Sequence, residues 1–193
     1  SNPVNGVIGT NSAIVQITDE DLPPIVGIAD NTSSESDGTL TFTVSLDNAS
    51  EKDLSLTYST MSSGTAEVSD FTATTGTLNF SAGDLTKTIS VALINDTTDE
   101  DNETFMVVLG SYQDVRQGDD TAIGTIQDDD NGPVISIADV PTINEVGAVQ
   151  TSRVSLSEAS EKTVQVQYQT QDGTALANND YNPVGLTVLT FQP

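Results

Sequence analysis

The sequence contains no cysteine, no histidine and no tryptophan. Without cysteine the chain can form neither disulfides nor thiolate metal sites, and without histidine it lacks imidazole catalysis and the usual zinc ligands. Basic residues are also scarce: five stand against 29 acidic ones, which gives a formal net charge of −24 over 193 residues. Because nucleic-acid affinity comes largely from lysine and arginine neutralising phosphates, we expect no nucleic-acid partner.

The rest of the composition is that of a folded chain. Hydrophobic residues make up 35% of the sequence and fall in regular alternation, which argues against disorder despite the acidity. The same net charge excludes binding to an anionic membrane surface. No run of 18 apolar residues is present, so we also expect no membrane insertion.

The chain repeats itself at an offset of about 110 residues, a domain-sized period rather than a solenoid period. Residues 13–21 read AIVQITDED and residues 122–130 read AIGTIQDDD. Farther along, LDNASEK at 46–52 matches LSEASEK at 156–162. The matches keep their order, so we interpret the chain as tandem copies of one domain.

We therefore expect a piece of a longer protein in three parts. Residues 1–23 would hold the last strand of a preceding repeat. Residues 24–131, called the central repeat below, would be complete, and residues 132–193, called the following repeat, would be the N-terminal two-thirds of another copy. Because the orphan strand and the unfinished repeat both lack partners, we also expect either strand exchange between copies of the chain through residues 4–20 or a poorly ordered following repeat.

Within the central repeat the apolar period is two. Leu40, Phe42, Val44 and Leu46 alternate with serine and threonine, the pattern of a half-buried strand. Similar patterns predict about seven short strands, at 25–30, 40–46, 54–58, 77–80, 89–93, 105–109 and 121–127. No convincing helical stripe is present. The prediction is an all-β fold made of immunoglobulin-like antiparallel β-sandwich repeats of about 110 residues.

Acidic residues gather in the connections between these strands, at Glu35, Asp70, the run 96–103 and the triplet 128–130. Strand parity predicts that several of these connections meet at one end of the sandwich. Oxygen ligands from separate loops suit calcium, whereas magnesium prefers stricter octahedra with fewer carboxylates. The alternative is that the acids are solvated and only keep the protein soluble, but the recurrence of an acidic triplet at 19–21 favours a site.

The same segments resemble the Calx-β domain family. The resemblance rests on ESDGTL at 35–40, GTA at 64–66 with DF at 70–71, GTLNFSAG at 76–83, the segment 94–105 and IQDDD at 126–130. It covers essentially the whole chain and implies calcium ligands at Glu35, Asp70, Asp96, Glu100, Glu103, Asp128, Asp129 and Asp130. Asn95 stands where calcium-binding members carry an acid, which implies fewer or weaker sites.

The resemblance implies a non-catalytic calcium-binding module that acts as a calcium-stiffened spacer or adhesion repeat of a large extracellular or surface protein of bacteria, with calcium ions and neighbouring repeats as partners. The alternative is a calcium-sensing regulatory domain of a transporter or enzyme. Paired carboxylates would also serve a glycosidase. A sugar cleft or a carbohydrate-binding surface is normally lined by aromatic rings, however, and aromatic residues make up only 5% of this chain.

Overall fold

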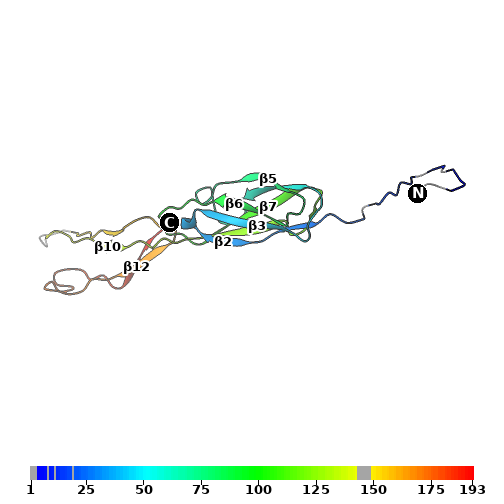
Figure 1. The fold of residues 1–193 in the computed structure, drawn as a ribbon. Helices are drawn as coiled ribbons and strands as arrows, with labels where there is room; N and C mark the ends of the chain where they lie inside the picture. Colours follow the sequence, from blue (N-terminus) through cyan, green and yellow to red (C-terminus); the bar gives the residue numbers. More distant parts are fainter. Residues whose placement is uncertain (1–3, 8, 11, 19, 143–148) are drawn as a thin grey trace.

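The structure, a computed structural model, describes residues 4–7, 9–10, 12–18, 20–142 and 149–193. Its central repeat is a sandwich of two β-sheets (Figure 1). In chain order the strands of this repeat are β1 (Ile25–Ile28), β2 (Asn31–Ser34), β3 (Thr39–Leu46), β4 (Leu54–Met61), β5 (Thr75–Phe80), β6 (Thr86–Ala92), β7 (Glu103–Gln113), β8 (Arg116–Gln117) and β9 (Thr121–Gln127). The predicted all-β sandwich is confirmed.

One sheet has the order β6-β3-β1-β8 and the other the order β2-β9-β7-β4-β5. Neighbouring strands pair in antiparallel fashion except for β1 with β8 and β2 with β9, which are parallel. The expectation of a purely antiparallel sandwich is therefore wrong at these two pairs. Only two residues separate β1 from β2, yet the two strands belong to different sheets. Each of them therefore pairs with a different late strand of the repeat, β1 with β8 and β2 with β9.

The core lies between the sheets, on the apolar faces that the alternation predicts. Along β3 every second residue is buried, with Phe42 at its centre. The Phe105 ring contacts Phe42 edge-on at 5.9 Å between centroids and stacks on Phe71 at 4.3 Å. Gly124 permits this packing, because a Cβ there would lie 2.7 Å from the Phe105 ring. The core is thus built mainly from strand residues, and apolar residues of the connections, such as Phe71, complete it.

Each of the seven predicted strands overlaps an observed one. The sequence pattern missed β2 and β8, which read NTSS and RQ and carry no apolar alternation. Their strand conformation comes from pairing instead, β2 along β9 and β8 along β1. The structure also contains one 3-10 turn, Glu35–Asp37, directly after β2.

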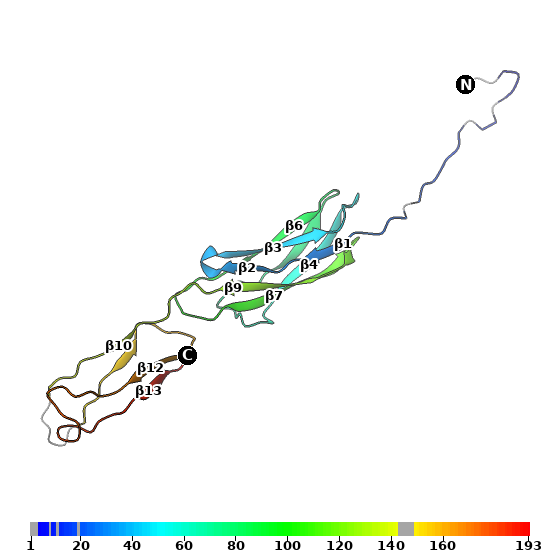
Figure 2. The ribbon, with the colours of Figure 1, turned by 90° about the horizontal axis from the view of Figure 1, so that it is seen from below.

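The two remaining parts of the chain leave the sandwich at opposite ends (Figure 2). The following repeat contains β10 (Ile135–Ile137), β11 (Val154–Leu156), β12 (Val164–Tyr168) and β13 (Thr187–Phe191), which form two separate two-stranded sheets. At the other end, residues 12–18 are not in a strand, and Ile14 and Ile17 are exposed. A strand needs a neighbour to hydrogen-bond with, and residues 12–18 pair with no strand in the part of the chain that the structure describes. Exchange between copies stays a prediction that light scattering can test.

Among the described residues no helix is long and apolar enough to cross a membrane.

Candidate metal centre

Four connections carry acidic side chains to the end of the central repeat that faces the following repeat. They are the turn after β2, the β4–β5 connection, the β6–β7 connection and the segment after β9. We call this end the acidic end. Six of the eight predicted ligands form two compact groups there, and the other two lie near both groups.

The first group consists of Glu35, Asp129 and Asp130, with one carboxylate oxygen of each within 4.8 Å of the other two. Glu35 opens the 3-10 turn and is only 5% exposed. Gly38 closes that turn in the left-handed region (φ 69°), and its N–H donates to the Glu35 carbonyl oxygen at 2.9 Å. The turn therefore fixes Glu35 beside the triplet after β9.

Two hydroxyl groups from the same turn hold Asp129 in place. Ser34 Oγ donates to Asp129 Oδ2 at 2.9 Å, and Ser36 Oγ donates to the same oxygen. These bonds keep the pKa of Asp129 below its usual range, because they favour the charged form. Asp129 therefore stays ionised next to a carboxyl group that is almost wholly buried.

The second group consists of Asp70, Glu100 and Glu103, again with oxygens within 4.8 Å of one another. Asp70 is 8% exposed, and its Oδ2 accepts a hydrogen bond from the Glu67 N–H. Glu103 is the first residue of β7, and Glu100 precedes it in the β6–β7 connection. The group is thus assembled from two separate connections.

Asp96 and Asp128 belong to neither group but act on both. Asp96 is exposed, and its Oδ1 accepts a hydrogen bond from the Thr98 N–H at 2.7 Å. Asp128 forms an ion pair with a lysine of the following repeat. The charges of both aspartates help to raise the pKa of Glu35 and of Glu100, so the two groups share one electrostatic field.

Crowding changes the protonation of three glutamates. Burial, followed by the charge of Asp130 and its neighbours, raises the pKa of Glu35 to about 7. Burial and nearby acids likewise raise the pKa of Glu100 to about 7. Burial, then a hydrogen bond and charge repulsion with Asp70, raise the pKa of Glu103 to about 8. Near neutral pH the metal-free site therefore retains protons that carboxyl groups in water would have lost.

Asp70 is the counterpart of Glu103 in this arrangement. Burial opposes its ionisation, but hydrogen bonds from the Glu103 carboxyl group, the Glu67 N–H and Ser69 outweigh burial and lower its pKa. Glu103 thus keeps its proton, and its carboxyl O–H donates a hydrogen bond to the Asp70 carboxylate.

Within the described part of the chain, three buried carboxylate oxygens have no hydrogen-bond partner: Glu35 Oε1, Glu103 Oε2 and Asp130 Oδ2. Buried polar atoms in folded proteins are nearly always satisfied, so unpartnered oxygens require an explanation. Both groups contain at least one of them, and every side chain offered is a hard oxygen donor. This donor set fits calcium, which takes six to eight oxygens at about 2.3–2.6 Å.

The shifted pKa values predict how the metal-free chain responds to pH. A carboxyl group with a raised folded-state pKa binds its proton more tightly in the folded than in the unfolded chain, so it favours folding below its ordinary pKa. This contribution is lost as pH rises from 4.5 through about 7 for Glu35 and Glu100 and about 8 for Glu103. We expect the melting temperature in chelator to be lower at pH 8 than at pH 5.5.

Thermal melts of the wild type and of Glu103→Gln at the two pH values check this expectation. The variant should show a smaller drop, because glutamine does not titrate. A wild-type melting temperature that is equal or higher at pH 8 would contradict the assigned protonation states.

The sequence analysis missed Asp99, which connects the acidic end to the following repeat. Asp99 is 8% exposed, and its Oδ1 pairs with Lys162 Nζ at 2.7 Å. Lys162 Nζ also contacts Asp128 Oδ2 at 3.2 Å. Hydrogen bonds from Lys162 and then Ser160 lower the pKa of Asp99. The sequence contained one indication that residues 159–162 have a role in this contact, because the motif ASEK occurs at both 49–52 and 159–162.

The fold and the two acidic groups define a class: a β-sandwich module with oxygen-only clusters at one end that could hold a divalent cation. The Calx-beta domain model matches residues 19–130 and again 128–193. The chain therefore belongs to the Calx-beta domain family, and the resemblance seen in the sequence is confirmed. A comparison with curated protein sequences gives no match.

Solved structures show the same fold. The apo-form Calx CBD1 domain is 22% identical with a TM-score of 0.52, covering 56% of this chain and 99% of that one. CBD12 from CALX1.2 is 23% identical with a TM-score of 0.52, covering 87% of this chain and 71% of that one. The calcium binding domain CBD12 of CALX1.1 is 22% identical with a TM-score of 0.52, over 86% and 70%.

Proposed function

We propose that the chain is a non-catalytic calcium-binding module whose acidic end braces the joint between successive repeats. The observation that carries this proposal is the set of buried oxygens of Glu35, Glu103 and Asp130 that have no partner among the described residues, at the end that touches the following repeat. Bound calcium would supply the positive charge that these oxygens lack. The six residues of the two groups, with Asp96 and Asp128 beside them, are the proposed ligands.

The chain's own residues give the mechanism. Without a cation the acidic connections repel one another, and the protons held by Glu35, Glu100 and Glu103 relieve this only in part. With the carboxylates neutralised, the connections can close together on the sandwich. Asp99 and Asp128 lie in the same connections and also hold Lys162, so ordering the connections orders the joint.

This mechanism suits a spacer or adhesion repeat of a large extracellular or bacterial surface protein. In such a protein a calcium-braced joint would keep a row of repeats extended. The extracellular location is part of the proposal and is supported by the family resemblance alone.

A second candidate is a calcium-sensing regulatory module of a transporter or enzyme. The observation that favours it is the similarity to the CBD12 structures, one of which is described as a calcium binding domain, over 87% and 86% of this chain. The two candidates differ in what flanks the repeats in the parent protein. Further Calx-beta repeats would favour the spacer, whereas membrane spans or a catalytic domain would favour the sensor.

Stiffening of the joint can be measured directly, because the absence of cysteine allows two spin labels to be placed at will. Thr41→Cys in β3 and Gln165→Cys in β12 are exposed strand positions on either side of the joint. We expect calcium to narrow the distance distribution between the labels relative to chelator, and magnesium to narrow it less. Identical distributions in calcium and chelator would rule out the bracing role.

A further inference from the structure

Residues 160–162 of the following repeat, Ser-Glu-Lys, are anchored on the acidic end at three points. Ser160 Oγ donates to Asp99 Oδ2 at 2.9 Å, and Lys162 Nζ pairs with Asp99 and Asp128. Between them, the Glu161 N–H donates to the Asp99 carbonyl oxygen at 3.1 Å. The backbone of Glu161 is therefore fixed beside the β6–β7 connection, where the second acidic group begins.

The register of this contact determines which side chains are neighbours. Asp99 and Ser160 form a parallel β-bridge, and Glu100 and Glu161 are the next residue of each segment. Ser160 and Lys162 both contact Asp99, so Glu161 between them is held next to the connection that carries Glu100. Adjacent strands lie about 4.8 Å apart, a span that carboxylate oxygens can bridge through a cation.

Two carboxylates side by side are destabilising unless a positive charge lies between them. Glu161 is exposed and directly follows the residue that bridges to Asp99. The lysine next to it does not relieve this repulsion, because Lys162 is paired with Asp99 and Asp128. Glu103 Oε2 in the same group is buried and has no hydrogen-bond partner in the described ranges.

We propose that Glu161 is a further calcium ligand, supplied by the following repeat to the group of Asp70, Glu100 and Glu103. The site then spans the joint, and its full affinity requires both repeats to be in place. This inference rests on the proposed function. It adds that calcium contacts the two repeats at once instead of ordering the central repeat alone.

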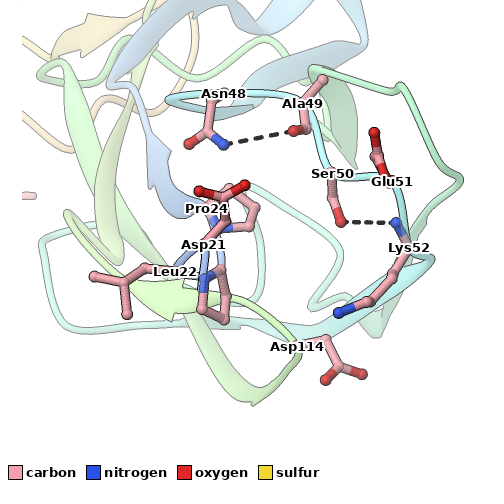
Figure 3. A pocket seen from close by; sticks show the side chains of 10 residues that line it. Asp21, Leu22, Pro24, Asn48, Ala49, Ser50, Glu51, Lys52 and Asp114 are labelled. Carbon is pink, nitrogen blue, oxygen red and sulfur yellow. Dashed lines mark hydrogen bonds between the residues drawn. The ribbon is translucent and has the colours of Figure 1, made fainter. Parts of the chain in front are cut away.

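The central repeat carries a matching turn at its opposite end. Lys52 N–H donates to Ser50 Oγ at 3.0 Å, as Lys162 N–H donates to Ser160 Oγ at 3.1 Å. The Ser-Glu-Lys turn at 50–52 therefore has the same bent form at the end of the sandwich away from the acidic end. It lines an open hollow together with Asp21 and Asp114 (Figure 3). From this hollow Glu51 would supply a calcium ligand to the acidic end of a preceding Calx-beta repeat, as Glu161 does for the central repeat.

Glu161→Gln and Glu51→Gln in the full chain form a matched pair for the test. Both remove one charge from a Ser-Glu-Lys turn, but only Glu161 lies at the acidic end. We expect calorimetric titration to show calcium affinity reduced on the order of tenfold or more in Glu161→Gln, the scale seen when residues around a metal are lost. Glu51→Gln should bind as the wild type does. Glu161→Asp, which keeps the charge, should recover part of the loss.

Each contrary result has a distinct meaning. If the wild type binds calcium and Glu161→Gln binds equally well, the shared ligand is refuted while the calcium-binding function stands. If Glu161→Gln and Glu51→Gln weaken binding equally, the effect is one of net charge, and the inference is again refuted. If the wild type binds no calcium, the proposed function fails, and this inference fails with it.

Discussion

Millimolar calcium is expected to raise the melting temperature of the chelator-treated chain by about 5–10 °C. A ligand that binds only the folded state stabilises it by mass action, by about 2.7 kcal/mol when its concentration is 100 times its dissociation constant. For a domain of this size each kcal/mol shifts the melting temperature by several degrees. The source of the gain is the relief of charge repulsion among carboxylates that already lie within 4.8 Å of one another.

Circular dichroism or calorimetric melts in chelator, calcium and magnesium measure this effect. Magnesium at equal concentration should give a smaller shift, because it prefers a strict octahedron and keeps several of its waters. Identical melting curves in chelator and calcium would disprove calcium binding by the folded chain. A shift that is the same for both cations would indicate unspecific screening of the −24 net charge instead.

The double variant Glu103→Gln with Asp129→Asn is expected to abolish most of that stabilisation. It neutralises one residue of each acidic group, so neither group keeps its full set of charged ligands. The core is formed by strand residues such as Phe42 and Phe105, so the metal-free fold should remain intact. Its metal-free melting temperature should stay close to that of the wild type at pH 8, because the repulsion removed at Glu103 offsets the charge-assisted hydrogen bonds lost at Asp129.

Glu51→Gln with Asp114→Asn provides the control for this variant. It makes the same two chemical changes at exposed positions near the opposite end of the sandwich. The control should keep the full calcium-dependent shift in melting temperature. A double variant at the acidic end that still shows the wild-type shift would refute the residue assignment, whatever the protein binds elsewhere.

Much of the fold could be predicted from the sequence, because the pattern that indicates a strand lies within the residues of that strand. A strand such as β3 has one face in the core, so burial imposes a period of two on its residues. In contrast, β2 is polar and lies in its sheet because β9 is beside it. No local pattern encodes that pairing, and the same holds for the parallel pairing of β1 with β8.

The candidate site, too, could be predicted from the sequence only in part. The acidic residues and their meeting at one end were predicted from strand parity and the family motifs. Their separation into two groups depends on tertiary positions such as that of the 3-10 turn carrying Glu35, which sequence spacing does not determine. Asp99 was missed because it looks like any acid in the run 96–103. Its role arises from Lys162, which lies far along the chain and becomes its neighbour only in the folded joint.

The most direct test of the account is a crystal structure of the chain grown in calcium, with ions located by anomalous scattering. The account predicts ions at the acidic end, with oxygens of Glu35, Glu103 and Asp130 among their ligands at about 2.3–2.6 Å. Anomalous density confined to other surfaces, or absent from the acidic end at saturating calcium, would contradict it.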